Sequence, residues 1–211
     1  KTTGTPPKGL DYNLWLGPAA EQAYHGNLVH YNWHWFWETG NGDTGNQGVH
    51  EMDVARWAIK GATMPKSVWS IGGRFGYEDQ GETPNTQMAV YEYDEALLIF
   101  ETRGLVGKHN IPRVVKNEYY TTEGKITGGK FYPKNGGKAV GLDNLGGEVQ
   151  PGGPFGNFID CVRSRKRDHL NADVAEGHYS SALCHLGNIS YRTGEKEAFD
   201  LKSRKFHKNP Q

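Results

Sequence analysis

The chain has 211 residues, a length within the range of a single domain built around one core. Lys plus Arg and Asp plus Glu number 24 each, so a net charge of zero excludes a general electrostatic attraction to nucleic acid or to an anionic membrane surface. The apolar runs, such as residues 96–100, are far shorter than the roughly 20 residues that a membrane-spanning helix needs. We therefore expect neither nucleic acid nor a membrane as a partner.

Residues 1–40 are predicted to be an irregular, aromatic-rich entry segment of this one domain, because Gly and Pro turn signals recur along them. Near the end of the segment lies a dense aromatic cluster with one histidine, made of Tyr31, Trp33, His34, Trp35, Phe36 and Trp37. The tryptophans alternate, so on an extended backbone they share one face and His34 takes the other. Flat rings of this kind suit stacking on sugars. The alternative is that the cluster is a wedge of the core.

Residues 40–48 contain four glycines and predict a turn that brings the backbone close to a ligand. A helix is predicted over 49–60, with His50, Asp53 and Trp57 on one face and with enough apolar residues to be buried. A histidine in the first turn, near a carboxylate, can have its tautomer fixed while one nitrogen faces a cleft, which suits proton transfer. The alternative is that His50 and Asp53 only cap and buttress the helix start.

The middle of the chain predicts antiparallel strands. One hairpin joins 87–93 to 96–102 through 94–95, a strand at 67–71 precedes it, and a second hairpin joins 117–122 to 125–132. Two helices are predicted to follow, at 155–165 and 172–191, and on the second the face expected to contact the sheet contains Val174, His178, Ala182, His185 and Ile189. Strands followed by helices indicate an α+β domain with the helices on one face of an antiparallel sheet.

Two kinds of site have no matching pattern. No Gly-x-Gly-x-x-Gly run follows a strand and opens a helix, since Gly40, Gly42 and Gly45 follow the aromatic cluster, so we predict no dinucleotide loop. The histidines match no compact metal-ligand spacing, so no metal site is predicted. Cys161 and Cys184 are expected to be buried free thiols.

At this point the motifs resemble a known family. The sequence resembles the bacterial branch of the Gfo/Idh/MocA oxidoreductases in five stretches, at 9–18, 33–53, 72–75, 160–165 and 170–194. The first of these begins Gly-Leu-Asp-Tyr and ends Gly-Pro. That family joins an amino-terminal Rossmann domain, with a catalytic Lys in a Glu-Lys-Pro motif, to a second domain built on a large open antiparallel sheet. The resemblance covers only the second domain.

The resemblance implies roles for several residues. The family's Asp-x-Gly-x-His signature corresponds to Asn46, Gly48 and His50, with a following acid at Asp53, and it assigns proton transfer to the histidine. Asn46 in place of the aspartate can orient substrate but cannot accept a proton. The predicted catalytic residues are therefore His50, Asn46 and Asp53. The predicted sugar-contacting residues are Trp33, His34, Trp35, Asp43, Gln47 and Arg74.

The expected function is that of the substrate-binding half of an oxidoreductase acting on a sugar or polyol. The complete enzyme would use NAD or NADP, neither of which is expected to bind tightly to this chain alone, and the sheet would form a homo-oligomer. The resemblance implies a bacterial protein and leaves cytoplasm or periplasm open. One alternative is a free-standing glycoside-cleaving domain, which needs paired carboxyls among Glu38, Asp43, Glu51 and Asp53. Another is a non-catalytic carbohydrate-binding or oligomerisation module.

Overall fold

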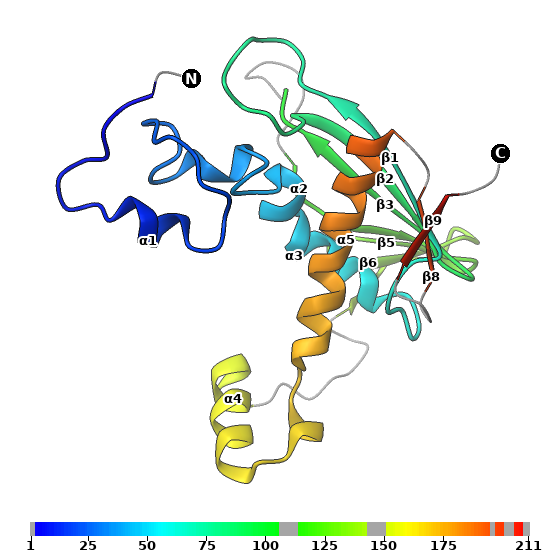
Figure 1. The fold of residues 1–211 in the computed structure, drawn as a ribbon. Coiled ribbons are helices and arrows are strands. Elements are labelled where there is room, and N and C mark those ends of the chain that lie inside the picture. Colours follow the sequence, from blue (N-terminus) through cyan, green and yellow to red (C-terminus); the bar gives the residue numbers. More distant parts are fainter. Residues whose placement is uncertain (1–2, 106–113, 143–150, 195–196, 201–204, 209–211) are drawn as a thin grey trace.

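The computed structural model describes residues 3–105, 114–142, 151–194, 197–200 and 205–208. The entry segment contains two short helices, α1 (Tyr12–Leu16) and the 3₁₀ helix η1 (Asn32–Trp35), and is otherwise irregular, as predicted. Next come α2 (Gly42–Asn46) and α3 (Gly48–Trp57). Figure 1 shows the segment with α1 on one side of the long helix α5 and the main strands on the other.

The strands form two antiparallel sheets. The larger one has the order β3-β2-β1-β8-β9, from β1 (Ser67–Gly73), β2 (Thr86–Glu92), β3 (Leu97–Arg103), β8 (Glu197–Asp200) and β9 (Lys205–Lys208). The smaller one has the order β4-β5-β6-β7, from β4 (Glu118–Tyr120), β5 (Gly124–Thr127), β6 (Lys130–Pro133) and β7 (Val140–Gly141). The predicted α+β class with antiparallel strands is confirmed, and the strands divide between two sheets.

The two predicted hairpins have different outcomes. The turn between β2 and β3 is confirmed, and Tyr93 N donates to Ala96 O at 2.9 Å across it. The predicted strand at 125–132 is wrong as one strand, because it is broken into β5 and β6. Gly128 and Gly129 lie at the break with φ of 55° and 71°, a conformation that favours glycine and reverses the chain.

Helix α5 (Val174–Thr193) packs along β1 and begins at Asp173, whose side chain accepts a hydrogen bond from Ala175 N. The predicted sheet-contacting face was wrong, because Val174, His178, His185 and Ile189 are exposed. The buried face instead consists of smaller or polar residues together with leucines, namely Ser180, Leu183, Cys184, Leu186, Gly187, Asn188 and Ser190.

Close approach of α5 to the sheet explains that choice of residues. A Cβ on Gly187 would lie 2.4 Å from Tyr91 Oη. Tyr91 Oη donates to Leu183 O at 2.9 Å, and Ser70 N donates to Ser190 Oγ at 3.0 Å. Hydrophobic periodicity misses such a face, because the helix is held by small side chains and buried hydrogen bonds as well as by apolar area.

The core lies between this sheet and helices α3 and α5. It contains Met52 from α3, Val68, Ala89, Tyr91 and Leu98 from the strands, and Leu183, Cys184 and Leu186 from α5. The opposite face of the sheet is exposed and apolar, with Trp69, Ile71, Met88, Leu97 and Ile99 among its side chains. The helices α3 and α5 therefore cover one face, and the other face has no cover among the described residues.

Helix α4 (Gly153–Ser164) and the 3₁₀ helix η3 (Arg167–His169) precede α5, and Figure 1 shows α4 beyond the end of α5 that is farther from the strands. The prediction that Cys161 and Cys184 are buried free thiols is confirmed. Among the described residues, no helix is both long and apolar enough to cross a membrane.

Candidate functional site

His50 lies in the first turn of α3 and is exposed. The predicted burial of this helix was wrong for one of its faces. Met52 and Arg56 are buried against the core and α5, whereas His50 and Trp57 face outward, with Trp57 68% exposed. A helix that packs by one stripe leaves the other in solvent. The imidazole is therefore open to a ligand.

The glycine run before His50 is a short helix, α2, rather than the predicted turn. A Cβ on Gly42 would lie 2.7 Å from Thr83 Cβ, one on Gly45 would overlap the Asn41 side chain, and one on Gly48 would lie 2.7 Å from the Phe100 ring. These glycines thus allow α2 and α3 to pack against their neighbours. Because the space beside these three glycines is filled by protein side chains, they do not form a loop that is open to a pyrophosphate.

Buried hydrogen bonds hold α2 on the sheet and on α5. Thr44 Oγ1 donates to Gln87 Oε1 at 2.6 Å, and Gln87 Nε2 donates to Ser70 Oγ at 3.0 Å. Asn188 Nδ2 of α5 donates to Asn41 O at 2.8 Å, immediately before α2. Buried polar groups that find partners in this way fix the position of the segment that leads to His50.

The predicted catalytic residue Asp53 contacts α5. Its Oδ1 accepts a hydrogen bond of 2.5 Å from Ser180 Oγ and lies 3.5 Å from the Arg56 guanidinium. Arg56, 4% exposed, also pairs with Glu176 at 2.5 Å and donates to Ala62 O at 2.8 Å. This arrangement favours a positioning role for Asp53, because its carboxylate joins α3 to α5.

The polar residues around His50 are partly exposed. Asn46, at the end of α2, and Gln47 are exposed, and Asp43 in the first turn of α2 is half-buried. Gln47 Nε2 donates to Glu51 Oε1 at 2.9 Å, and Glu51 Oε2 also accepts from Asn117 Nδ2 at 3.2 Å. The exposed amide of Asn46 therefore remains next to the start of α3 as a candidate contact for ligand hydroxyls, whereas the Asp43 carboxylate on α2 interacts electrostatically with Arg74.

Residues 32–35 of the aromatic cluster form the 3₁₀ helix η1, so the extended backbone on which Trp33 and Trp35 would share one face does not occur there. Within η1, the His34 ring lies 3.9 Å from the Trp35 ring, centroid to centroid, and only 5% of His34 is exposed. His34 therefore lines neither of two surface pockets, in contrast to its predicted sugar contact. Trp33 and Trp35 point to different pockets, because successive odd positions do not share a face on a helix.

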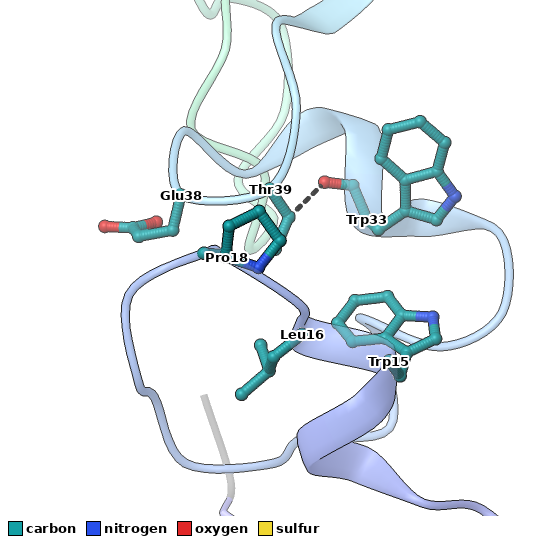
Figure 2. Close-up of a pocket in the computed structure, with 7 residues that line it drawn as sticks. Trp15, Leu16, Pro18, Trp33, Glu38 and Thr39 are labelled. Carbon is teal, nitrogen blue, oxygen red and sulfur yellow. Dashed lines mark hydrogen bonds between the residues drawn. The ribbon is translucent and has the colours of Figure 1, made fainter.

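The larger pocket, of about 490 Å³, lies between α1 and η1. It is lined by Trp15, Leu16, Pro18, Ala19, Trp33, Glu38 and Thr39, and Figure 2 shows the two indoles one above the other beside Pro18 and Leu16. Sequence reasoning had selected Trp33 and missed Trp15. The signal was available, because Asp11 is an N-cap residue that predicts a helical turn presenting Trp15.

The smaller pocket, of about 220 Å³, contains the predicted residues Trp35 and Arg74. Asp79 forms an ion pair with the Arg74 guanidinium, which also donates to Thr83 O at 2.9 Å. This hydrogen bonding lowers the pKa of Asp79 from its ordinary value, so the pair stays ionised at neutral pH. With most of its donors engaged within the protein, Arg74 primarily shapes the wall of this pocket.

Paired carboxylates, which glycoside cleavage by the domain itself would need, line neither of these pockets. Glu38 is the single acid in the larger one, and Asp79, paired with Arg74, is the single acid in the smaller one. Asp53 and Glu51 are engaged by α5 and Asn117. Neither of these two pockets therefore offers the pair of carboxylates that the hydrolase alternative needs. In the same residues no group of three metal-ligating side chains occurs.

The sequence matches a family model over residues 2–211, and that model is described as the C-terminal alpha/beta domain of an oxidoreductase family, Gfo/Idh/MocA. No protein of curated function matches the chain. The match covers almost the whole length of the chain.

Solved structures share the fold. One is the WlbA dehydrogenase from Bordetella pertussis in complex with NADH and UDP-GlcNAcA, with 18% identity, a TM-score of 0.54, and coverage of 80% of this chain and 48% of that chain. Another is an oxidoreductase from Agrobacterium radiobacter in complex with NAD+, L-tartaric acid and magnesium, with 14% identity, a TM-score of 0.52, and coverage of 72% and 47%. The chain therefore spans about half the length of these structures.

Proposed function

Because the chain belongs to the Gfo/Idh/MocA oxidoreductase family as its C-terminal domain, we propose that it is the substrate-binding half of a nicotinamide-dependent sugar or polyol oxidoreductase. The observation on which the proposal rests is the exposed imidazole of His50 at the start of a helix that is firmly anchored from behind. An imidazole is suited to accept a proton near neutral pH.

The proposed chemistry divides between two polypeptide halves. Oxidation of an alcohol removes a proton from oxygen and a hydride from carbon. We assign the proton to His50, while Asn46 and Asp43 bind neighbouring hydroxyls and Asp53 holds α3 in place through Ser180. We assign the hydride acceptor to a nucleotide-binding half. The side chains of Thr83 and Phe100 occupy the space beside Gly42 and Gly48, so these glycines leave no room for the pyrophosphate of a cofactor.

Two findings support the substrate and cofactor class. A structure of similar fold was solved with NADH and a UDP-sugar, and another with NAD+ and a hydroxy acid. A sugar or polyol fits both observations.

We also propose that the exposed face of the larger sheet is a homo-oligomer interface. Trp69, Val90 and Ile99 lie side by side in one row across β1, β2 and β3, and Ile71 pairs with Met88 in the next row. A contiguous apolar surface of this kind marks a protein contact, since isolated domains seldom leave one exposed. An apolar face of this kind can pack against the same face of a second copy related by a twofold axis.

Calorimetric titration tests the division of labour. NAD+ and NADP+ titrated into this chain should give no binding in the micromolar range, whereas addition of the nucleotide-binding half of the same enzyme should give cofactor binding and alcohol oxidation. Clear micromolar binding of either cofactor to this chain alone would refute the proposal.

A further inference from the structure

The pocket of about 490 Å³ between α1 and η1 is separate from the His50 site, because no residue of α2 or α3 lines it. We propose that this pocket binds a pyranose ring of a carbohydrate, and that this ring is a different one from the ring that reacts beside His50. The proposal rests on the proposed function only where it refers to a second ring that reacts beside His50. The evidence for the pocket comes from its own walls.

Both indoles of the pocket are held in place by neighbouring groups. Tyr12 stacks on Trp15 with ring centroids 5.7 Å apart and planes 12° apart, which supports one face of that indole. Trp33 belongs to η1, and its ring lies 5.3 Å from the ring of the buried His34, centroid to centroid, with planes 74° apart. Aromatic side chains that are already ordered lose little conformational entropy when a ligand binds.

The turn between α1 and the rest of the pocket is also fixed. Leu14 N donates to Asp11 Oδ1 at 2.9 Å, which caps α1 at its start. Gly17 ends the helix with φ of 55°, a conformation that favours glycine, and the turn places Pro18 against the pocket. The α1 side of the pocket, which includes Trp15, is thus formed by a short, capped element.

The chemistry of the lining matches a pyranose. The indoles with Leu16, Pro18 and Ala19 form an apolar surface, and Glu38 and Thr39 add a carboxylate and a hydroxyl. A pyranose ring has an apolar C–H face that stacks on an indole, and hydroxyl groups at its edge that need hydrogen-bond acceptors. The carboxylate of Glu38 is exposed in the free protein, so the protein does not pay to bury this charge before the carboxylate accepts hydrogen bonds from the sugar.

A quaternary ammonium group is the other ligand class that aromatic walls and a carboxylate can bind. Sites for such cations surround the charge with several aromatic faces. In this pocket Trp15 and Trp33 are the aromatic lining residues, and Leu16, Pro18 and Ala19 complete the wall with aliphatic groups. The aliphatic share favours stacking of a ring on one side over enclosure of a cation.

The test follows the indole N–H signals of the chain by NMR after ¹⁵N labelling of its six tryptophans. Maltose and cellobiose, titrated to about 50 mM, a concentration that populates millimolar sites, should shift the signals of Trp15 and Trp33. Trp57 and Trp69 are exposed outside the pocket and should not shift. Unchanged Trp15 and Trp33 signals with both sugars, or equal shifts at Trp57, would overturn the proposal.

Variants separate recognition from folding. Trp15→Ala should weaken sugar binding at least about tenfold, a loss of about 1.4 kcal/mol, while Trp57→Ala leaves it unchanged. Trp15→Phe should restore part of the affinity, and retained Trp57 and Trp69 signals show that the variant is folded. Choline chloride is the competing probe, and a shift by choline with none by either sugar contradicts the proposal. The His50→Gln variant should bind sugar in this pocket normally. If the wild-type pocket does not bind sugar, the further inference is wrong, and the role of His50 is still tested separately by turnover.

Discussion

Ser180 on α5 donates a hydrogen bond of 2.5 Å to the Asp53 carboxylate on α3. The same helix α3 presents His50 one turn earlier on its exposed side. The position of the imidazole therefore depends on how α3 is attached to α5. Because α5 in turn is fixed on the sheet by Tyr91 and Ser190, the candidate site is supported by the whole core.

The buried guanidinium of Arg56 should be important for stability. Arg56→Met removes its pairs with Glu176 and Asp53, and because those carboxylates are 44% and 33% exposed, we expect a loss of about 1–3 kcal/mol, at or below the range for fully buried pairs. Arg103→Met is the control, since Arg103 pairs with Glu101 on the surface and should cost under about 1 kcal/mol. Denaturant unfolding measures both, and equal losses would contradict the assignment.

Two glycines of α5 should respond in opposite directions to alanine. Gly187→Ala places a Cβ 2.4 Å from Tyr91 Oη, and we expect destabilisation by about 1–3 kcal/mol from overpacking. Gly177→Ala meets nothing within 4 Å on the exposed side of the helix and should stabilise the protein by about 0.5–1 kcal/mol. Thermal unfolding compares the two, and a stable Gly187→Ala variant would show that α5 is not in close contact with β2.

How far the sequence predicts the fold differs between its elements. The first hairpin follows from local turn chemistry, which is why its turn at 94–95 was found correctly, whereas the helix predicted over 49–60 extends past the end of α3 at Trp57. The buried face of α5 could not be found from apolar periodicity. Its contacts depend on Gly187 and Ser190, whose role appears only when the partner strand is in place.

The carboxylate of Asp173 should make the stability of the protein depend on pH in the acid range. Hydrogen bonds from Arg167 and from Ala175 N hold its pKa at about 2, below the ordinary 3.8. A lowered pKa contributes stability that is fully present above about pH 4 and is lost as the pH falls toward about 2. Asp173→Asn should therefore reduce the fall in melting temperature between these pH values. An identical acid profile for variant and wild type would mean that the cap does not titrate as described.

The exposed face of the larger sheet should govern assembly. Ile99→Lys adds a charge to the row that contains Trp69, and we expect the oligomer to dissociate in light-scattering measurements. Leu14→Lys alters an even more exposed apolar residue, on α1, and should leave assembly unchanged. A wild-type chain that is monomeric at all concentrations, or an Ile99→Lys variant that assembles normally, would contradict the proposed interface.

The candidate site was predictable in part. A motif singled out His50, Asn46 and Asp53 as catalytic candidates, and the structure places His50 at the surface and Asp53 against α5. The separation of Trp33 from Trp35 and Arg74 was not predictable, because the sequence hypothesis considered the tryptophans on an extended backbone. A 3₁₀ helix sends Trp33 toward Trp15 and Trp35 toward Arg74, and no local pattern specifies that distant pairing.

The proton-transfer role proposed for His50 is tested most directly by the turnover number of the complete enzyme in which His50 is replaced by Gln. Loss of a general base should lower kcat about 10²–10⁴-fold with little change in sugar affinity. His178→Gln, which alters an exposed histidine on α5, serves as the control and should retain full activity. A His50→Gln enzyme that oxidises its substrate at the wild-type rate would contradict the account.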